Sequence, residues 1–289
     1  LKIKEGERLE VKISSPSKTS GYIKNKLENK PLSREQIFKI IEDVVSNKLS
    51  EAEISMFISA MYINRMNFKE TVALIEAISK NGKKLNIKGK YTADKHCIGG
   101  IAGNRTTPIV VSICAAAGLK IPKNSSRAIT RAAGTADVME AVTGIEFNAR
   151  EIEKIVKKTN ACIVWGGALG LVPADSKIIR IEKSINIDPR AQLLASIMSK
   201  KLASGTKNIL IDIPYGKFAK VNKKQAEELK KDFEKLGKYF NKNLKGVLTE
   251  GNQPIGQGVG AILELEDILR VLKNDGPEDL KEKSLYLAG

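Results

Sequence analysis

Apolar side chains recur at helical spacing through the first third of the chain. Over residues 33–80, apolar residues return every three or four positions, as they do on the buried face of an amphipathic helix. Ser33 with Gln36, and Ser50 with Glu53, match the capping-box pattern that starts a helix. The pattern predicts three consecutive helices, and because each has one apolar face, we expect them to pack together as a small helical lobe.

From about residue 91 the pattern changes to short apolar segments that alternate with helices. Such alternation predicts a largely parallel sheet covered by helices. The predicted strands are Tyr91–Lys95, Lys120–Pro122, Ala161–Trp165, Ile209–Ile213 and Val247–Thr249. The predicted helices between them are Thr107–Ala117, Glu151–Lys158 and Lys223–Phe240.

A helical segment over residues 173–205 interrupts this alternation. The two patterns together predict an α/β fold with a small all-helical lobe and a larger α/β lobe. We assign residues 17–81 and 173–205 to the helical lobe, and residues 82–172 and 206–289 to the α/β lobe. Residues 1–16 are interpreted as the remnant of an N-terminal domain.

Composition narrows the class of protein. The 289 residues include 49 lysines and arginines against 33 aspartates and glutamates, a formal net charge of +16, which favours anionic substrates. Aromatic residues are only 5%, which disfavours nucleic acid as a partner. Three widely spaced cysteines and no apolar run of membrane length predict a cytoplasmic protein with reduced thiols and no metal site.

The segment 94–108 combines Gly99, Gly100 and Gly103 with a following helix. Glycines let backbone N–H groups approach an anion, and a helix N-terminus adds positive potential. The segment is therefore interpreted as a phosphate-binding loop, although it lacks the spacing of the known nucleotide fingerprints. Its neighbours Lys95, His96 and Thr107 are further candidates; a flexible turn with a stray lysine is the alternative.

A second polar segment, residues 124–137, is dense in hydroxyl and guanidinium groups. Hydroxyls donate to phosphate oxygens, and arginine binds them in bidentate fashion. Ser126, Arg127, Arg131 and Thr135 therefore predict a second anion site if the segment lies near the glycine loop. For each of these residues taken singly, an ordinary polar loop is the simpler interpretation.

Asp188 and Pro189 precede a strong helix that runs to Ala203. A capping role is the default interpretation of Asp188, because aspartate and proline are common at helix starts. Gln192, Ser196 and Lys200 recur every four residues and share one face, which either lines a cleft or meets water; the apolar residues of the helix, including Leu193 and Ile197, take the other face. Two further loops are rich in glycine: Lys220 lies in one, after a predicted strand, and the other, residues 251–260, is interpreted as structural or cleft-lining.

At these motifs the chain resembles the pyrimidine-nucleoside phosphorylase family, and most closely its archaeal-type branch, which acts on AMP. The resemblance covers essentially the whole chain. It rests on six blocks in the family's order: Lys95–Thr107, Ser125–Asp137, Trp165–Asp175, Ile187–Gly205, Ile211–Val221 and Gly251–Gly260. Any one block is weak evidence, whereas six in order are specific.

The resemblance implies a nucleoside phosphorylase class II-like fold and the reaction AMP plus phosphate giving adenine plus ribose 1,5-bisphosphate. Asp188 would be the proton donor, and no cofactor and no metal would be needed. The implied substrate-binding residues are Gly100, Ser126, Arg127, Ala128, Ile129, Thr130, Arg131, Thr135, Ser196 and Lys220. Possible additional site residues are Lys95, His96, Thr107, Ser125 and Lys200. A homodimer or higher homo-oligomer is expected, with no membrane partner.

Two departures from the family pattern bear on specificity. Thymidine-specific members have an arginine that binds the pyrimidine at a position that here is Ile181 or Glu182, which disfavours thymidine. Cys97 stands where relatives place serine, so we expect a weaker phosphate grip or compensation by Thr106 or Thr107. The family's C-terminal β-rich domain is not found in this sequence.

Two other functions stay open. A pyrimidine nucleoside phosphorylase would use the same chemistry without the 5′-phosphate, and a catalytically idle nucleotide-binding relative would share the fold. Anthranilate phosphoribosyltransferase shares the general architecture, but its chemistry requires acidic metal ligands that we do not find in the sequence.

Overall fold

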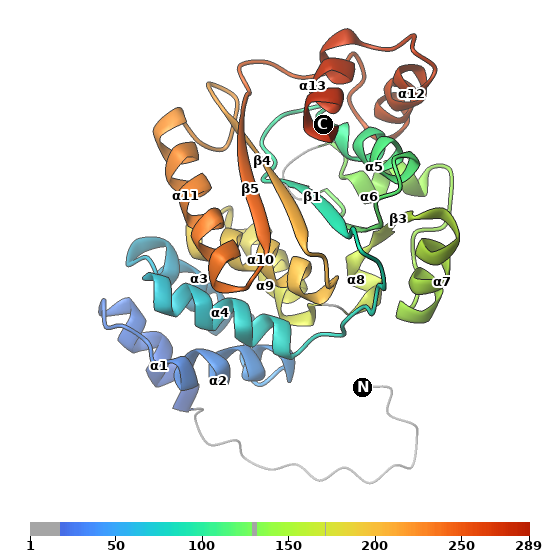
Figure 1. Ribbon diagram of the computed structural model, residues 1–289. Coiled ribbons are helices and arrows are strands. Elements are labelled where there is room, and N and C mark those ends of the chain that lie inside the picture. The colour runs from blue at the N-terminus through green and yellow to red at the C-terminus, as the bar shows by residue number, and fades with distance from the viewer. Residues whose placement is uncertain (1–17, 129–131, 171) are drawn as a thin grey trace, which may run out of the picture.

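The computed structural model describes residues 18–128, 132–170 and 172–289 (Figure 1). The helices are α1 (Lys18–Leu27), α2 (Arg34–Val45), α3 (Glu51–Ile63), α4 (Phe68–Lys80), α5 (Thr106–Ala116), α6 (Thr135–Glu140), α7 (Ala149–Thr159), α8 (Gly166–Leu169), α9 (Pro173–Ile185), α10 (Arg190–Ala203), α11 (Lys223–Tyr239), α12 (Ala261–Leu272) and α13 (Glu278–Ala288). The strands are β1 (Ala93–Cys97), β2 (Ile121–Ser125), β3 (Ala161–Trp165), β4 (Asn208–Tyr215) and β5 (Asn243–Glu250).

The three helices predicted over residues 33–80 are α2, α3 and α4. Both predicted capping boxes form, since the side chains of Ser33 and Ser50 accept hydrogen bonds from the backbone N–H groups of Gln36 and Glu53. The sequence did not predict α1, which has a weak apolar stripe and buries Ile23. In Figure 1, α1–α4 form one layer at the lower left of the molecule.

Helices α9 and α10 return to this layer from the middle of the chain. They pack against α2, α3 and α4, so the segment predicted to be helical over residues 173–205 lies beside the N-terminal helices. The exact domain boundaries stay a prediction, and the proposed N-terminal remnant, residues 1–16, lies outside the described residues.

The described strands are all parallel, as predicted. Hydrogen bonds join them in the orders β1-β4-β5 and β2-β3, and an isolated parallel bridge between Thr92 and Lys120 links the two groups. Because parallel strands end at the same edge, the residues after β1, β2 and β4 meet there, which is where ligands bind in such sheets.

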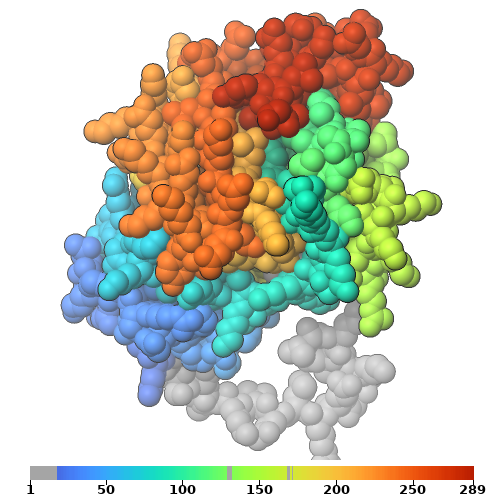
Figure 2. All heavy atoms as spheres, in the orientation of Figure 1, coloured from blue at the N-terminus to red at the C-terminus, as the bar shows by residue number. Residues whose placement is uncertain are grey.

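One apolar core extends from the helices into the sheet, and it includes Ile40, Ile78, Ile211 and Phe233. A separate cluster lies under α12, around Ile268. The N-terminal and C-terminal helices lie at opposite ends of the molecule in Figure 2, blue and red respectively. The shared core holds the helical layer and the sheet in a fixed relation, which positions the cavity between them.

Candidate active site

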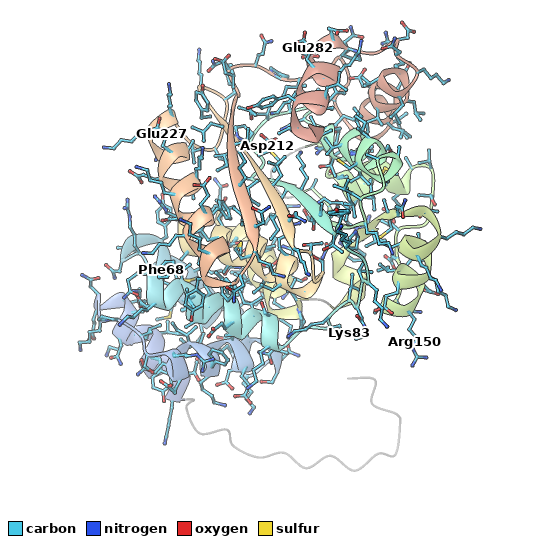
Figure 3. The ribbon with its side chains drawn as sticks, viewed as in Figure 1. Phe68, Lys83, Arg150, Asp212, Glu227 and Glu282 are labelled. Atoms are coloured by element: carbon cyan, nitrogen blue, oxygen red, sulfur yellow. The ribbon has the colours of Figure 1, made fainter. Side chains whose placement is uncertain are left out.

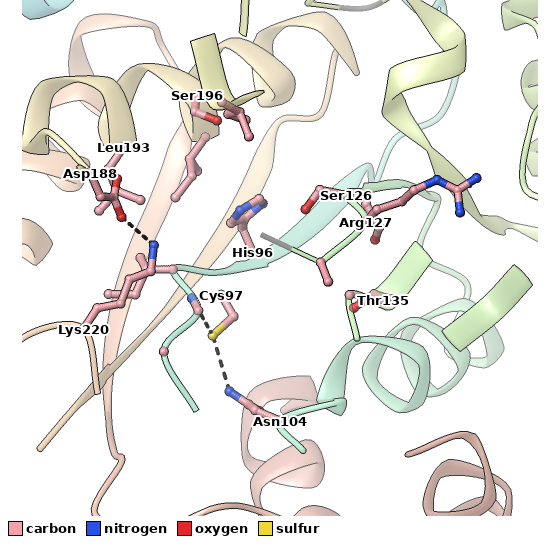
Figure 4. A pocket seen from close by; sticks show the side chains of 18 of the residues that line it. His96, Cys97, Asn104, Ser126, Arg127, Thr135, Asp188, Leu193, Ser196 and Lys220 are labelled. Atoms are coloured by element: carbon pink, nitrogen blue, oxygen red, sulfur yellow. Dashed lines mark hydrogen bonds and ion pairs between the residues drawn. The ribbon is translucent and has the colours of Figure 1, made fainter. Parts of the chain in front are cut away.

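A cavity of about 530 Å³ opens between the carboxyl ends of β1 and β2 and the helices α9 and α10 (Figure 4). The glycine loop after β1 and the hydroxyl-rich segment after β2 both line it. The link between α9 and α10 and the inner face of α10 also line the cavity, as does Lys220 of the loop after β4, which packs against the glycine loop. The two predicted anion-binding segments therefore meet in one cavity.

Most of the predicted site residues lie at this cavity. Those that line it are His96, Gly100, Thr107, Ser125, Ser126, Arg127, Ala128, Thr135, Asp188, Ser196, Lys200 and Lys220. Ile129, Thr130 and Arg131 lie outside the described residues. The remaining candidate, Lys95, does not line the cavity. The contacts of all these candidate residues with substrate stay predictions.

Position 100 accepts only glycine, because of its backbone conformation and because the Lys220 backbone lies close to it. Its φ of +108° lies in a region that side chains disfavour. A Cβ atom on Gly100 would lie 2.8 Å from the backbone nitrogen of Lys220, so the loop after β4 can approach only a glycine. The glycine-rich 251–260 segment packs behind this loop, where the Ile255 N–H donates to the Ala102 carbonyl at 3.0 Å, in keeping with a structural role.

Lys95 faces away from the cavity. Alternate side chains of a strand point to opposite faces, so His96 lines the cavity while Lys95 lies on the other side of β1. Its Nζ donates to Thr106 Oγ1 at 2.6 Å and lies 3.8 Å from Asp212, which Figure 3 labels on β4. Burial lowers the pKa of Lys95, although Asp212 opposes this. The ammonium group of Lys95 therefore forms a buried ion pair and is not exposed at the cavity.

Cys97 presents a weakly polar thiol where the resemblance to the family led us to expect a serine hydroxyl. Its Sγ accepts hydrogen bonds from the Gly99 N–H and from Asn104 Nδ2, both at 3.4 Å (Figure 4). Burial is the main cause that raises its pKa to about 11, so it stays neutral at pH 7. Of the two threonines expected to compensate, Thr107 lines the cavity, whereas Thr106 is fully buried and bonded to a lysine.

The guanidinium of Arg127 points away from the centre of the cavity (Figure 4). It forms a bidentate ion pair with Glu140 and lies 3.6 Å from both Asp137 and Glu146. Its carbon Cζ also lies 4.5 Å from the centroid of the Trp165 ring. Binding of an anion by this guanidinium therefore requires the Glu140 pair to break.

Unpaired polar groups lie beside Arg127. Both amide atoms of Asn124 and the Oγ of Ser125 are buried without a hydrogen-bond partner among the described residues, and Asn124 is 2% exposed. Buried polar groups are nearly always bonded, so these atoms are available to a ligand. Asn124 was not among the predicted site residues, although it begins the same polar segment.

Lysines surround His96 and make this side of the cavity positive. Burial, and then Lys201 and Lys123, hold the pKa of His96 well below its usual value, so its ring is neutral at pH 7. Burial lowers the pKa of Lys123 to about 7, and the charge of Lys201 acts in the same direction. An anion bound here would relieve this crowding of positive charge.

Asp188 does not cap the helix that follows it, so the default interpretation was wrong. Helix α10 begins at Arg190, with Pro189 at the N-cap position and no side-chain capping bond. The Asp188 carboxylate instead accepts a hydrogen bond from Lys220 Nζ at 2.5 Å (Figure 4). Asp188 is available to the cavity because Pro189 occupies the cap position.

The polar face predicted for α10 is confirmed, since Gln192, Ser196 and Lys200 all line the cavity. Asp175 of α9, which is 1% exposed, connects them. Its carboxylate accepts hydrogen bonds from Gln192 Nε2 at 3.1 Å and Lys200 Nζ at 2.5 Å. Lys200 also donates to Ser196 Oγ at 2.8 Å. Sequence reasoning placed Asp175 in a motif but gave it no role.

Apolar residues complete the wall near α9. Leu193 and Ile197, expected on the opposite face of α10, also line the cavity because its opening spans more than one stripe of the helix. Glu182 of α9 lines the same region, whereas Ile181 is buried in the core and 3% exposed. Of the two residues aligned with the family's arginine, Glu182 is therefore the one at the cavity.

The fold and the cavity define a class of protein in which a helical bundle and an α/β domain enclose a cavity lined by glycine, hydroxyl and lysine residues. Residues 20–82 match the model described as the helical bundle domain of a glycosyl transferase family, and residues 89–239 match its a/b domain. The chain belongs to this glycosyl transferase family, which confirms the predicted fold class.

Several relatives are named AMP phosphorylase. The one from Pyrococcus furiosus is 46% identical over 286 residues, covering 98% of this chain and 57% of the relative. The one from Natronomonas pharaonis is 43% identical, covering 99% and 57%. A Legionella pneumophila (strain Paris) protein named "Putative thymidine phosphorylase" is 44% identical, covering 100% and 56%. The chain thus spans little more than half the length of these curated relatives.

Among solved structures, anthranilate phosphoribosyltransferase from Thermus thermophilus superposes with a TM-score of 0.73, covering 92% of this chain and 87% of that one. At 14% identity this likeness shows the fold alone. Within the described residues, no helix is long and apolar enough to cross a membrane.

Proposed function

We propose that this chain is a pentosyltransferase that catalyses the phosphorolysis of nucleoside 5′-monophosphates. AMP plus phosphate gives adenine plus ribose 1,5-bisphosphate. The observation that carries the proposal is the single cavity in which the Gly100 loop and the Ser126 segment face the Asp188–Lys220 pair. Relatives at 41–46% identity that are named AMP phosphorylase support the choice of substrate.

In this proposal the two polar segments bind the two phosphate groups. Backbone N–H groups at Gly100 and the hydroxyls of Ser126 and Thr135 donate to phosphate oxygens, as Thr107 does in place of the missing serine. Ser196 of α10 and Lys220, beside the glycine loop, also bind the nucleotide. Holding the two reactants in one cavity supplies a large part of the rate acceleration.

The bond changes require one proton from the enzyme. An oxygen of inorganic phosphate forms a bond to C1′ while the bond from C1′ to the base nitrogen breaks, and the electron pair stays with adenine. Adenine then takes up a proton that Lys220 Nζ passes on through the Asp188 carboxyl group, along the hydrogen bond that Lys220 donates to Asp188. The proton that HPO4²⁻ loses on forming the ester restores Lys220. General acid catalysis of this kind contributes about 10²–10⁴-fold.

The decisive experiment is an assay of base release. The protein is incubated with phosphate and, in parallel, AMP, CMP, UMP, adenosine or thymidine, and free base is measured by chromatography. We expect release that depends on phosphate, with nucleotides preferred over nucleosides. Release of thymine without release of adenine would contradict the proposal.

A pyrimidine nucleoside phosphorylase is the second candidate, because a relative at 44% identity is named "Putative thymidine phosphorylase". The same assay separates the two, since this candidate requires turnover without a 5′-phosphate. No base release from any of the five substrates would favour an idle nucleotide-binding relative.

The predicted homo-oligomer and the predicted cytoplasmic location stay predictions. Tyr62 and Ile63 are 58% and 69% exposed at the end of α3, and such apolar side chains are available for contact between subunits. Size-exclusion chromatography with light scattering measures the oligomeric state directly.

A further inference from the structure

Glu182 is a carboxyl group in the cavity that the proposed chemistry does not use. Its Oε1 atom is buried and has no hydrogen-bond partner among the described residues. No lysine or arginine of the described chain forms an ion pair with it, unlike the two aspartates nearby. It shares the wall with the apolar side chains of Leu193 and Ile197. An unpaired acceptor next to an apolar wall is suited to the edge of a flat, polar ring.

We propose that Glu182 binds the nucleobase as a neutral carboxylic acid, donating its O–H to N1 of adenine and accepting a hydrogen bond from the exocyclic amino group. The inference rests on the proposed function for the identity of the ligand. A carboxylic acid presents one donor beside one acceptor, and adenine presents the complementary acceptor and donor side by side. An ionised carboxylate presents acceptors alone and repels the lone pair of N1.

The surroundings of Glu182 keep it protonated. Burial, and then the carboxylates of Asp188 and Asp175, raise the pKa of Glu182 to about 8, although Lys220 and Lys200 oppose them. The two lysines do not offset burial because each is already paired: Lys220 with Asp188, and Lys200 with Asp175, both at 2.5 Å. Each ion pair is close to neutral as a unit, so the buried carboxyl retains its proton at pH 7.

The arrangement assigns different tasks to two neighbouring carboxyl groups. The Asp188 carboxyl group accepts a hydrogen bond from Lys220, whereas the Glu182 Oε1 has no such partner among the described residues and the Glu182 carboxyl group is neutral, because their environments differ. When Glu182 holds one edge of the base, the base also lies beside Asp188, the group that the proposed function uses to protonate it. A site whose polar group is matched to the ligand discriminates strongly against an analogue that lacks the matching atom.

The test is calorimetric titration of the full chain with AMP and with 1-deaza-AMP, in which a C–H group replaces N1. The proteins are the wild type, Glu182→Gln and Glu182→Ala. Glutamine keeps one donor and one acceptor but does not ionise, and Glu266→Gln, at an exposed position on α12, is the matched control. Titrations at pH 7 and pH 9 bracket the ionisation of Glu182.

We expect the wild type to bind AMP about tenfold more weakly at pH 9 than at pH 7, because a group of pKa about 8 is then about nine-tenths ionised. In Glu182→Gln the fall in AMP affinity that is caused by ionisation of Glu182 is absent. Any fall that remains between pH 7 and pH 9 is caused by ionisation of Lys123 and of the phosphate group. Glu182→Ala weakens AMP binding at pH 7 at least tenfold. It weakens binding of 1-deaza-AMP less, because that analogue keeps the exocyclic amino group but has no N1 to accept the O–H of Glu182. The control behaves as the wild type does.

An equal pH dependence in the wild type and Glu182→Gln overturns the inference, as does unchanged AMP affinity in Glu182→Ala. If the alanine variant fails to fold, the glutamine comparison still decides. Failure of the proposed function gives a different result: AMP binds with the Glu182 signature, but no base is released. Conversely, base release with an unchanged KM for AMP in Glu182→Ala rejects the inference and leaves the proposed function intact. A wild type that binds no AMP at either pH contradicts both.

Discussion

Lys220 and Asp188 join two separate parts of the chain at the cavity wall. The Lys220 Nζ, from the loop after β4, lies 2.5 Å from the Asp188 Oδ2, in the link between α9 and α10. The side chains are 28% and 44% exposed, so the pair lies at the cavity wall in contact with solvent. Ion pairs in such positions add little to stability, and the pair is therefore better explained by chemistry than by folding.

The first prediction concerns Asp188→Asn. Asparagine fills the same space but cannot deliver a proton, so we expect base release from AMP to fall about 10²–10⁴-fold. The melting temperature should change little, because the pair is exposed. Glu51→Gln is the matched control, since it breaks another exposed pair, with Arg180 at 2.5 Å, and neither residue lines the cavity. Full activity of Asp188→Asn would mean that the pair of Asp188 and Lys220 has a structural role only.

The second prediction concerns the glycine loop. In Gly100→Ala, the new Cβ meets the Lys220 backbone nitrogen at a φ of +108°, so the two loops must separate. We expect the KM for phosphate to rise at least tenfold and the melting temperature to fall.

Gly21→Ala provides the contrast for this loop. Gly21 lies inside α1 with open space around its Cα, so alanine there should stabilise the protein by about 0.5–1 kcal/mol and leave the KM for phosphate unchanged. A Gly100→Ala protein with wild-type phosphate kinetics would mean that the loop does not bind phosphate.

Local patterns in the sequence predicted the elements well, because the information lies within a few residues. The capping boxes at Ser33 and Ser50 mark helix starts, and β3 has the predicted bounds, Ala161–Trp165. Helix α1 was missed since its short sequence buries only Thr19, Ile23 and Lys26. The sequence predicted a single sheet, but the strands are hydrogen-bonded in two groups, β1-β4-β5 and β2-β3. Which strands pair depends on segments far apart in the sequence, so local patterns do not predict it.

Side-chain direction at the site was less predictable. Motifs indicated which segments meet, but the strand alternation that turns Lys95 away from the cavity depends on the register of β1 with β4. The guanidinium of Arg127 turns to Glu140, thirteen residues further on, which no spacing rule indicates. Glu182 was noted as an alignment position, yet its protonation follows from burial and from neighbours that only the fold brings together.

The third prediction concerns the reactivity of Cys97. Burial raises the pKa of its thiol from 9.0 to about 11, so the reactive thiolate is about a hundredfold less abundant than in the unfolded chain at pH 8. We expect iodoacetamide to modify Cys97 correspondingly slowly in the folded protein, measured by mass spectrometry of peptides against a urea-unfolded control. Rapid modification of Cys97 at pH 8 would contradict the raised pKa of this half-buried thiol.

The fourth prediction concerns Lys123, which is 4% exposed and has its pKa lowered from 10.5 to about 7, chiefly by burial. Between these values the unfolded chain holds a proton that the folded protein has released, so the contribution of Lys123 to stability rises with pH over this range. Lys123→Met removes the buried charge. Asp94 keeps an ion-pair partner in the variant, since Lys201 Nζ lies 2.6 Å from it.

The gain in melting temperature of Lys123→Met over the wild type should therefore be largest at pH 6 and should shrink steadily toward pH 9.5. Thermal unfolding in phosphate-free buffers measures this difference, because a bound anion would compensate the charge of Lys123 and mask it. Lys231→Met, at an exposed position on α11, is the control and should show no such trend. A difference of equal size at every pH would mean that Lys123 keeps its proton in the folded protein, with Asp94 outweighing the cost of burial.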